Sequence, residues 1–137
     1  MKRYEFFSHT ADIGVRVFGK TLKELFENAS FALFSVMFER GGEERERRSF
    51  DISSSSLDLL LVKYLTEFLY LFDVEFFVPS RVEIDYIDEK SVRGSVYGEK
   101  FDERKHEIKY SVKAITLHNL HIEKEKNIYK VEIIFDI

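Results

Sequence analysis

The sequence contains no cysteine, and this absence excludes several classes of protein at once. Without thiols the chain cannot form disulfide bonds, bind zinc through thiolates, hold an iron–sulfur cluster or use a cysteine nucleophile. No apolar run approaches the roughly 20 residues that a membrane-spanning helix needs, and the first residues lack the pattern of a signal peptide. We therefore expect a soluble, cytoplasmic protein that has no membrane partner.

Basic residues are too few for a protein that captures nucleic acid by charge. The chain carries 21 Lys and Arg against 25 Asp and Glu, a formal net charge of −4. Electrostatic capture of a phosphate backbone requires a basic face. We expect any contact with RNA to be indirect.

Common catalytic motifs are missing as well. The sequence contains no Gly-rich phosphate loop, no nucleophile elbow and no zinc-binding His pair on a helix. It also shows no internal repeat and no composition shift that would divide it. The length of 137 residues and the 45% hydrophobic content predict a single domain over residues 1–137 with a proper core.

Two amphipathic helices are expected. Thr21 and Glu24 form a capping-box pattern, and apolar residues at spacings of three and four predict a helix over 21–38. Ser55 and Asp58 give a second capping signal before a similar stripe from Leu57 to Phe72. The aromatic residues in this second stripe are expected in the core.

The remaining segments alternate with a period of two, which is typical of strands. These segments are 3–8, 13–18, 82–86, 92–97, 108–116, the region of 122, and 131–135. Turn signals at 88–90, 102–104 and 124–127 indicate antiparallel hairpins, and the charge run 43–48 indicates an exposed loop or edge strand. The predicted fold is a single α+β domain with two helices packed on a largely antiparallel sheet.

Carboxylates near the two ends of the sequence are the main candidates for a site. Asp12 precedes a predicted strand, where aspartate commonly caps a turn, and Asp136 follows another, where it could be a solvated end. If the strands pair, both carboxylates and the terminal carboxylate of Ile137 would crowd together. Such a cluster needs a proton or a hard divalent cation, and oxygen ligands favour Ca²⁺, Mg²⁺ or Mn²⁺ over zinc.

Other polar residues at predicted strand ends allow two interpretations. His9, His118 and His121 could bind a metal or move protons, although isolated histidines there are more often surface residues. Lys113 could meet a phosphate or carboxylate, or simply lie on a solvated face. Gly98 indicates a bulge or close approach that could direct the Glu99 carboxylate.

Several of these residues occur in longer strings. They are His9-Thr10-Ala11-Asp12-Ile13-Gly14, Thr21-Leu22-Lys23-Glu24-Leu25-Phe26, Gly98-Glu99, Lys113-Ala114-Ile115-Thr116 with His118, and the final Asp136-Ile137. On these motifs the chain resembles the archease family over essentially its whole length. Two positions depart from the family pattern, because Leu117 stands where Tyr is usual and Tyr64 where Trp is common.

The resemblance implies an accessory protein that is not itself an enzyme. Members of this family activate the RtcB-type RNA ligase of tRNA splicing by promoting its guanylylation and multiple turnover, and can broaden its nucleotide use. Carried over to this chain, a divalent metal site falls on Asp12, Asp136 and Ile137. Calcium is the expected metal in vitro, with Mg²⁺ or Mn²⁺ as alternatives, and tRNA is contacted only indirectly. Residues expected beside the metal site or at the partner contact are His9, Thr10, Glu99, Lys113 and His118.

Two other functions stay open at this point. One is a metal-independent interaction or chaperone-like module for RNA-modifying enzymes. The other is a small metal-dependent phosphohydrolase that uses Asp12, Asp136 and His9. The sequence offers no nucleophile with an orienting partner for the second alternative, and we therefore place it last.

Overall fold

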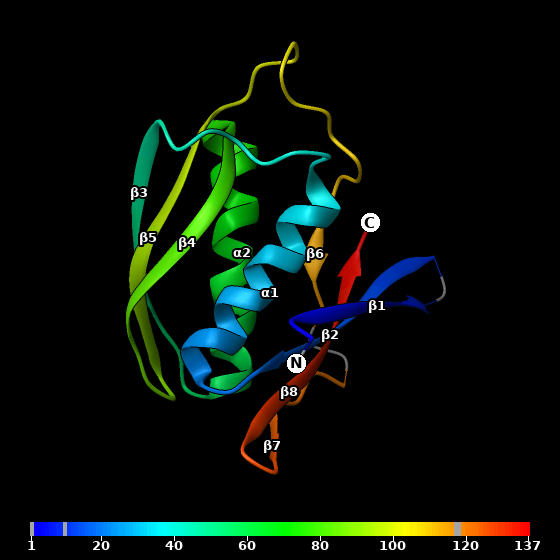
Figure 1. Ribbon diagram of the computed structural model, residues 1–137, viewed down its shortest axis with the longest axis vertical. Coiled ribbons are helices and arrows are strands. Elements are labelled where there is room, and N and C mark those ends of the chain that lie inside the picture. Colours follow the sequence, from blue (N-terminus) through cyan, green and yellow to red (C-terminus); the bar gives the residue numbers. More distant parts are fainter. Residues whose placement is uncertain (1, 10, 117–118) are drawn as a thin grey trace.

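The computed structural model describes residues 2–9, 11–116 and 119–137 (Figure 1). The elements in chain order are β1 (Tyr4–His9), β2 (Asp12–Gly19), α1 (Leu22–Met37), β3 (Glu46–Ser53), α2 (Leu57–Glu75), β4 (Phe77–Ile87), β5 (Ser91–Lys100), β6 (Ala114–Ile115), β7 (Glu123–Glu125) and β8 (Ile128–Asp136). The predicted α+β class is confirmed, since two helices pack on antiparallel strands.

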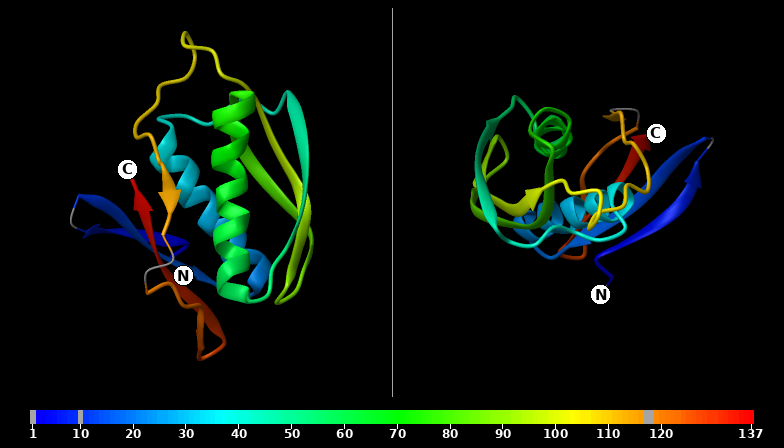
Figure 2. Two further views of the ribbon diagram at one scale, coloured as in Figure 1. Left: turned by 180° about the vertical axis from the view of Figure 1, so that it is seen from behind. Right: turned by 90° about the horizontal axis from the view of Figure 1, so that it is seen from above.

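The strands form two sheets, whereas the sequence pattern predicted one. A five-stranded sheet has the order β1-β2-β8-β6, with β7 paired to β8, and a three-stranded sheet has the order β3-β5-β4. Neighbouring strands are antiparallel in both sheets. The helices lie between the sheets (Figures 1 and 2), and each helix contacts strands of both.

Both helices have an N-cap residue whose side chain accepts a hydrogen bond from the first turn. The Thr21 hydroxyl accepts a hydrogen bond from the Glu24 amide at 3.1 Å, as its capping pattern predicts. The second helix is capped by Ser56, which accepts from the Leu59 amide at 3.3 Å. The prediction of Ser55 as this cap is therefore wrong by one residue. Asp58 instead accepts from the Ile122 amide at 2.9 Å and ties α2 to the segment before β7.

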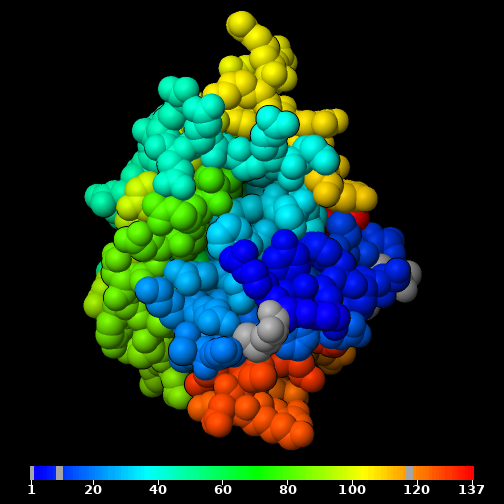
Figure 3. All heavy atoms as spheres, in the orientation of Figure 1, coloured from blue at the N-terminus to red at the C-terminus, as the bar shows by residue number. Residues whose placement is uncertain are grey.

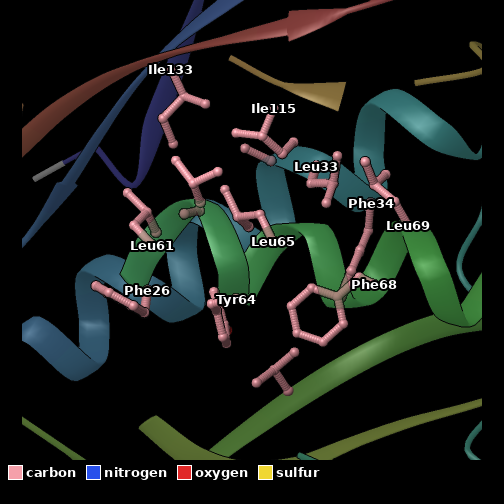
Figure 4. Close-up of a cluster of buried hydrophobic side chains, with 14 of the residues drawn as sticks. Phe26, Leu33, Phe34, Leu61, Tyr64, Leu65, Phe68, Leu69, Ile115 and Ile133 are labelled. Carbon is pink, nitrogen blue, oxygen red and sulfur yellow. The ribbon is translucent and has the colours of Figure 1, made fainter. Parts of the chain in front are cut away.

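The core fills the space between the helices and the two sheets (Figure 4). The α2 aromatic rings of Tyr64 and Phe68 are almost completely buried, which confirms that they are core residues. Their centroids lie 4.9 Å apart in an edge-to-face arrangement, a geometry that aromatic pairs favour. Ile115 and Ile133 extend the same core into the five-stranded sheet.

The segment 101–113 is mostly a loop, so the prediction of a strand over 108–116 is wrong for all but Ala114–Ile115. The loop crosses from β5 in one sheet to β6 in the other, and its yellow atoms protrude at the top of Figure 3. The turn at 102–104 therefore closes no hairpin. Ile108 forms an isolated backbone bridge with Phe38, but the side chains of Ile108 and Tyr110 are exposed.

The other strand predictions hold with small changes. The turns at 88–90 and 124–127 close the β4–β5 and β7–β8 hairpins, and the charge run 43–48 leads into the edge strand β3. The strand expected near 122 is the short β7. Among the helices of the described residues, none is both long and apolar enough to cross a membrane.

Candidate functional site

The predicted acidic residues meet at one end of the five-stranded sheet, which we call the acidic end and define by Asp12, Asp136 and Ile137. Ile13 is paired with Phe135 in the β2–β8 register, so one further step along both strands sets Asp12 opposite Asp136. Lys113 approaches from the other side of β8, and its amide donates to the Asp136 carbonyl at 2.7 Å. Strand pairing thus gathers residues that lie far apart in the sequence.

The strand register places the two aspartates of the acidic end on the face away from the helices. Phe135 and Ile115, which are paired with each other, point into the core. Successive side chains of a strand point to opposite faces, so Asp136 lies on the outer face, and Asp12 lies on the same face in the continued register. Both aspartates are partly buried.

A tight turn presents Asp12. The β1–β2 hairpin sets the backbone of His9 opposite Asp12, and Ala11 in the turn has a positive φ of 59°. Left-handed backbone is uncommon for residues other than glycine and often marks functional turns. The side chain of His9, and all of Thr10 and His118, lie outside the described residues, so their roles as contacts stay predictions.

The donors at the acidic end fit a hard divalent cation. Across residues 2–9, 11–116 and 119–137, no group of three His, Cys, Asp or Glu side chains is arranged to bind a metal. A site here would therefore combine the two aspartates with main-chain oxygen from Ile137. An oxygen-only donor set of this kind suits Ca²⁺, Mg²⁺ or Mn²⁺.

Thr116 adds an oxygen that was not among the predicted ligands. Its amide donates to the Ile134 carbonyl at 3.0 Å, and strand alternation places Ile134 on the same face as Asp136. The Thr116 hydroxyl is buried and has no hydrogen-bond partner within the described part of the chain. A threonine in a strand-like run carries no signal that would single it out.

Glu99 lies in the three-stranded sheet, on β5, and not in the sheet of the acidic end. The close approach that Gly98 indicated is confirmed, because Gly98 lies directly against the Val78 carbonyl. The opposite strand β4 has a register shift at this point, between Pro79 and Arg81. The role of Glu99 as a partner contact stays a prediction.

A buried network surrounds the Glu99 carboxylate, which is 7% exposed. It accepts from the Glu43 amide at 2.7 Å and from the Lys105 ammonium at 2.8 Å. His106 Nε2 lies 3.0 Å away, while His106 Nδ1 accepts from the Asp102 amide at 2.9 Å. This pattern indicates a neutral His106 that donates from Nε2.

The network changes the acidity of Glu99 and anchors two loops. Burial alone would raise the pKa of Glu99, but the hydrogen bonds from Lys105, the Glu43 amide and His106 outweigh burial and lower this pKa to about 2. The same bond to Glu99 raises the pKa of Lys105. Residues 43–45 and 102–106 are thereby tied to the end of β5. The sequence did not predict the roles of Lys105 and His106, because their spacing from Glu99 matches neither the helical nor the strand period.

The ionisation of Glu99 makes the free energy of unfolding depend on pH in the acidic range. Its pKa rises from about 2 when folded towards the ordinary 4.5 when unfolded, so its contribution is complete above pH 4.5 and is lost as pH falls towards 2. We expect Glu99→Gln to be less stable than the unmodified protein at pH 7, by up to about 3 kcal/mol. This difference should shrink as pH falls, in urea unfolding followed by circular dichroism.

The exposed Glu89 on the β4–β5 turn provides the matched control. Glu89→Gln should follow the pH profile of the unmodified protein. Parallel profiles for Glu99→Gln and the unmodified protein between pH 5 and pH 2 would contradict the assigned role of the carboxylate.

The fold and the acidic end together define a class of small α+β domains in which two helices lie between antiparallel sheets and carboxylates from distant strands meet at a sheet end. The sequence profile of the Archease protein family (MTH1598/TM1083) matches residues 4–137. The chain belongs to this family.

Named relatives match all or most of the chain. The chain is 41% identical to the archease of Sulfurisphaera tokodaii, covering 100% of both, and 44% identical to that of Pyrococcus furiosus, covering 90% of each. The solution structure of Methanobacterium thermoautotrophicum protein 1598 is similar, with a TM-score of 0.82, 38% identity and 100% of both chains covered. The crystal structure of a Thermotoga maritima archease, described as a possible chaperone, shares the fold at 20% identity, with a TM-score of 0.70 and coverage of 96% and 94%.

Proposed function

We propose that this protein is a non-catalytic accessory factor that activates an RtcB-type tRNA-splicing RNA ligase by promoting its guanylylation and multiple turnover. The observation that supports the proposal is the β2–β8 register, which pairs Ile13 with Phe135 and, continued by one step, would set Asp12 opposite Asp136 and next to the main chain of Ile137. Membership of the archease family supports the choice of partner.

The proposed working surface is the acidic end with a divalent cation. Asp12, Asp136 and the main-chain oxygens of Ile137 would hold the ion, and the Thr116 hydroxyl is a further oxygen on the same face. A bound cation would offset the aspartate charges and provide a positive centre for phosphate oxygens. Lys113, whose amide donates to the Asp136 carbonyl, has an exposed side chain that could add positive charge near this end of the sheet. With a net charge of −4, the protein would bind the ligase and meet tRNA only through it.

The test is multiple-turnover joining of cyclic-phosphate and 5′-hydroxyl RNA halves by the partner ligase with GTP. We expect the unmodified protein to raise turnover by about tenfold or more, and Asp12→Ala and Asp136→Ala to lose that stimulation, since each removes a charged metal ligand. Asp85→Ala is the matched control, because Asp85 is exposed on β4 in the other sheet.

Each outcome separates the proposal from its alternatives. Full stimulation by Asp12→Ala would overturn the role of the acidic end. Metal binding is measured separately as a rise in melting temperature with Ca²⁺, Mg²⁺ or Mn²⁺, because a ligand of the native state must stabilise it. Stimulation without any such rise would indicate a metal-independent module. Hydrolysis of phosphate esters by the purified protein, lost in Asp136→Asn, would indicate the phosphohydrolase.

A further inference from the structure

The two edges of the three-stranded sheet differ in how they are protected. The β4 edge contains Pro79 and two register shifts, after Pro79 and after Ile84. Prolines and bulges block pairing with another strand. The β3 edge has neither, and β3 follows β5 in unbroken register from Glu46 to Ser53. In Figures 1 and 2, β3 lies at the rim of the molecule.

Alternate residues of β3 form hydrogen bonds with β5, and this alternation shows which backbone groups of β3 point outward. The Ser54 amide donates to the Lys90 carbonyl at 2.9 Å, so even-numbered residues of this segment pair with β5. The N–H and C=O groups of Arg47, Ser49 and Asp51 consequently point away from the sheet. Their side chains are all exposed. Three outward residues in a row form a ready template for an added strand.

We propose that β3 pairs with β3 of a second copy of this chain, antiparallel about a two-fold axis at Ser49. In this register Arg47 of each copy lies opposite Asp51 of the other. A two-fold axis at Arg47 or at Asp51 would set two like charges opposite one another. With the axis at residue 48 or 50, Arg47 of one copy would not lie opposite Asp51 of the other. The charge pattern of the strand is therefore complementary to itself in one register. The pairing adds about six main-chain hydrogen bonds.

The charges needed for this pairing are available. Within the described part of the chain, neither Arg47 nor Asp51 makes a side-chain ion pair. Arg93, the β5 neighbour of Asp51, lies instead over the Tyr86 ring at 4.4 Å. The Arg47 carbonyl accepts from Arg48 Nη1 at 3.2 Å, and a carbonyl has a second lone pair for a partner amide.

The two-fold axis also brings apolar surface together. An axis perpendicular to the sheet places α2 of both copies on the same face of a continuous six-stranded sheet. Beside the β3 edge, a cleft of about 500 Å³ lies between β3 and α2 and is lined partly by Ile52, Val62 and Tyr70. Tyr70 is 53% exposed. The clefts of the two copies would face one another, and covering them adds hydrophobic stabilisation. This inference does not depend on the acidic end or on the ligase.

A single cysteine tests the register directly, because the chain has none of its own. In the proposed dimer the two Ser49 Cα atoms are about 5.5 Å apart, which suits a disulfide. Ser49→Cys should form a covalent dimer under mild oxidation. Ser53→Cys is the matched control, since it is exposed on the same strand face but its two copies would lie about 27 Å apart. Equal crosslinking of both variants would overturn the register.

Charge reversal tests the proposal without crosslinking. Sedimentation over a range of concentrations should show a monomer–dimer equilibrium for the unmodified protein. Arg47→Asp and Asp51→Arg should each weaken the dimer by about tenfold or more, because each sets two like-charge pairs opposite one another. The double variant should restore it. A monomer at every concentration, or no recovery in the double variant with all circular dichroism spectra unchanged, would overturn the proposal.

Discussion

Replacing Phe68 with alanine is expected to lower the free energy of unfolding by about 4 kcal/mol, the range for removing a buried aromatic ring. Phe68 is 1% exposed. Its ring makes edge-to-face contacts with Tyr64, Phe34 and Phe50 at centroid distances of 4.9, 5.2 and 5.9 Å. The cavity would open between α1, α2 and β3, where helices and strands from three parts of the chain support each other. Urea unfolding measures the change.

Tyr70 on the same helix provides the control for this effect. More than half of its side chain is exposed, so Tyr70→Ala should change the free energy of unfolding by less than about 1 kcal/mol. The comparison is made at a concentration where the protein is monomeric. Equal losses for Phe68→Ala and Tyr70→Ala would show that the core is not centred on this ring.

Gly98→Ala is expected to destabilise the protein by about 3 kcal/mol, because an added methyl group would collide with fixed backbone. A Cβ at Gly98 would overlap the Val78 carbonyl on the neighbouring strand β4. A main-chain carbonyl held in a sheet cannot swing aside as a long side chain can. The strands would have to separate next to Glu99, which would also loosen the bonds from Lys105 and His106.

A second glycine allows a matched comparison. At Gly41 the nearest atoms to an added Cβ are 3.4 Å away, an ordinary contact distance. Gly41→Ala should therefore leave the melting temperature within a few degrees of that of the unmodified protein. If Gly98→Ala is tolerated equally well, the close approach at β4 is not rigid.

Local patterns predicted the helices well because a helix is determined largely by nearby residues. The Thr21 and Glu24 cap and the apolar spacing predicted the start and the buried face of α1. The error at the second cap arose because four consecutive serines offer the same chemistry, and only packing selects Ser56. Asp58 could not be read as a tether, since its partner Ile122 lies 64 residues further along the chain.

Contacts between distant segments were harder to predict from the sequence than the helices were. Ile108 and Tyr110 alternate as strand residues do, yet they lie in the loop that links the sheets. Both side chains are exposed, so the alternation here does not correspond to a buried face, and only one backbone bridge, from Ile108 to Phe38, forms. A division into two sheets likewise depends on pairing choices that no single segment encodes. The meeting of Asp12 with Asp136 required such a pairing, so the sequence could raise it only as a condition.

The chain order of the five-stranded sheet has a consequence for synthesis. Both helices and the sheet of β3, β4 and β5 lie within residues 22–100, so every strand of that sheet is present once this stretch has been synthesised. β2 must wait for β8, its neighbour in the sheet, although both helices and five other strands lie between the two in the chain. Pairings of such high contact order form late. A product that stops before β8 lacks the partner of β2 and could not assemble the acidic end.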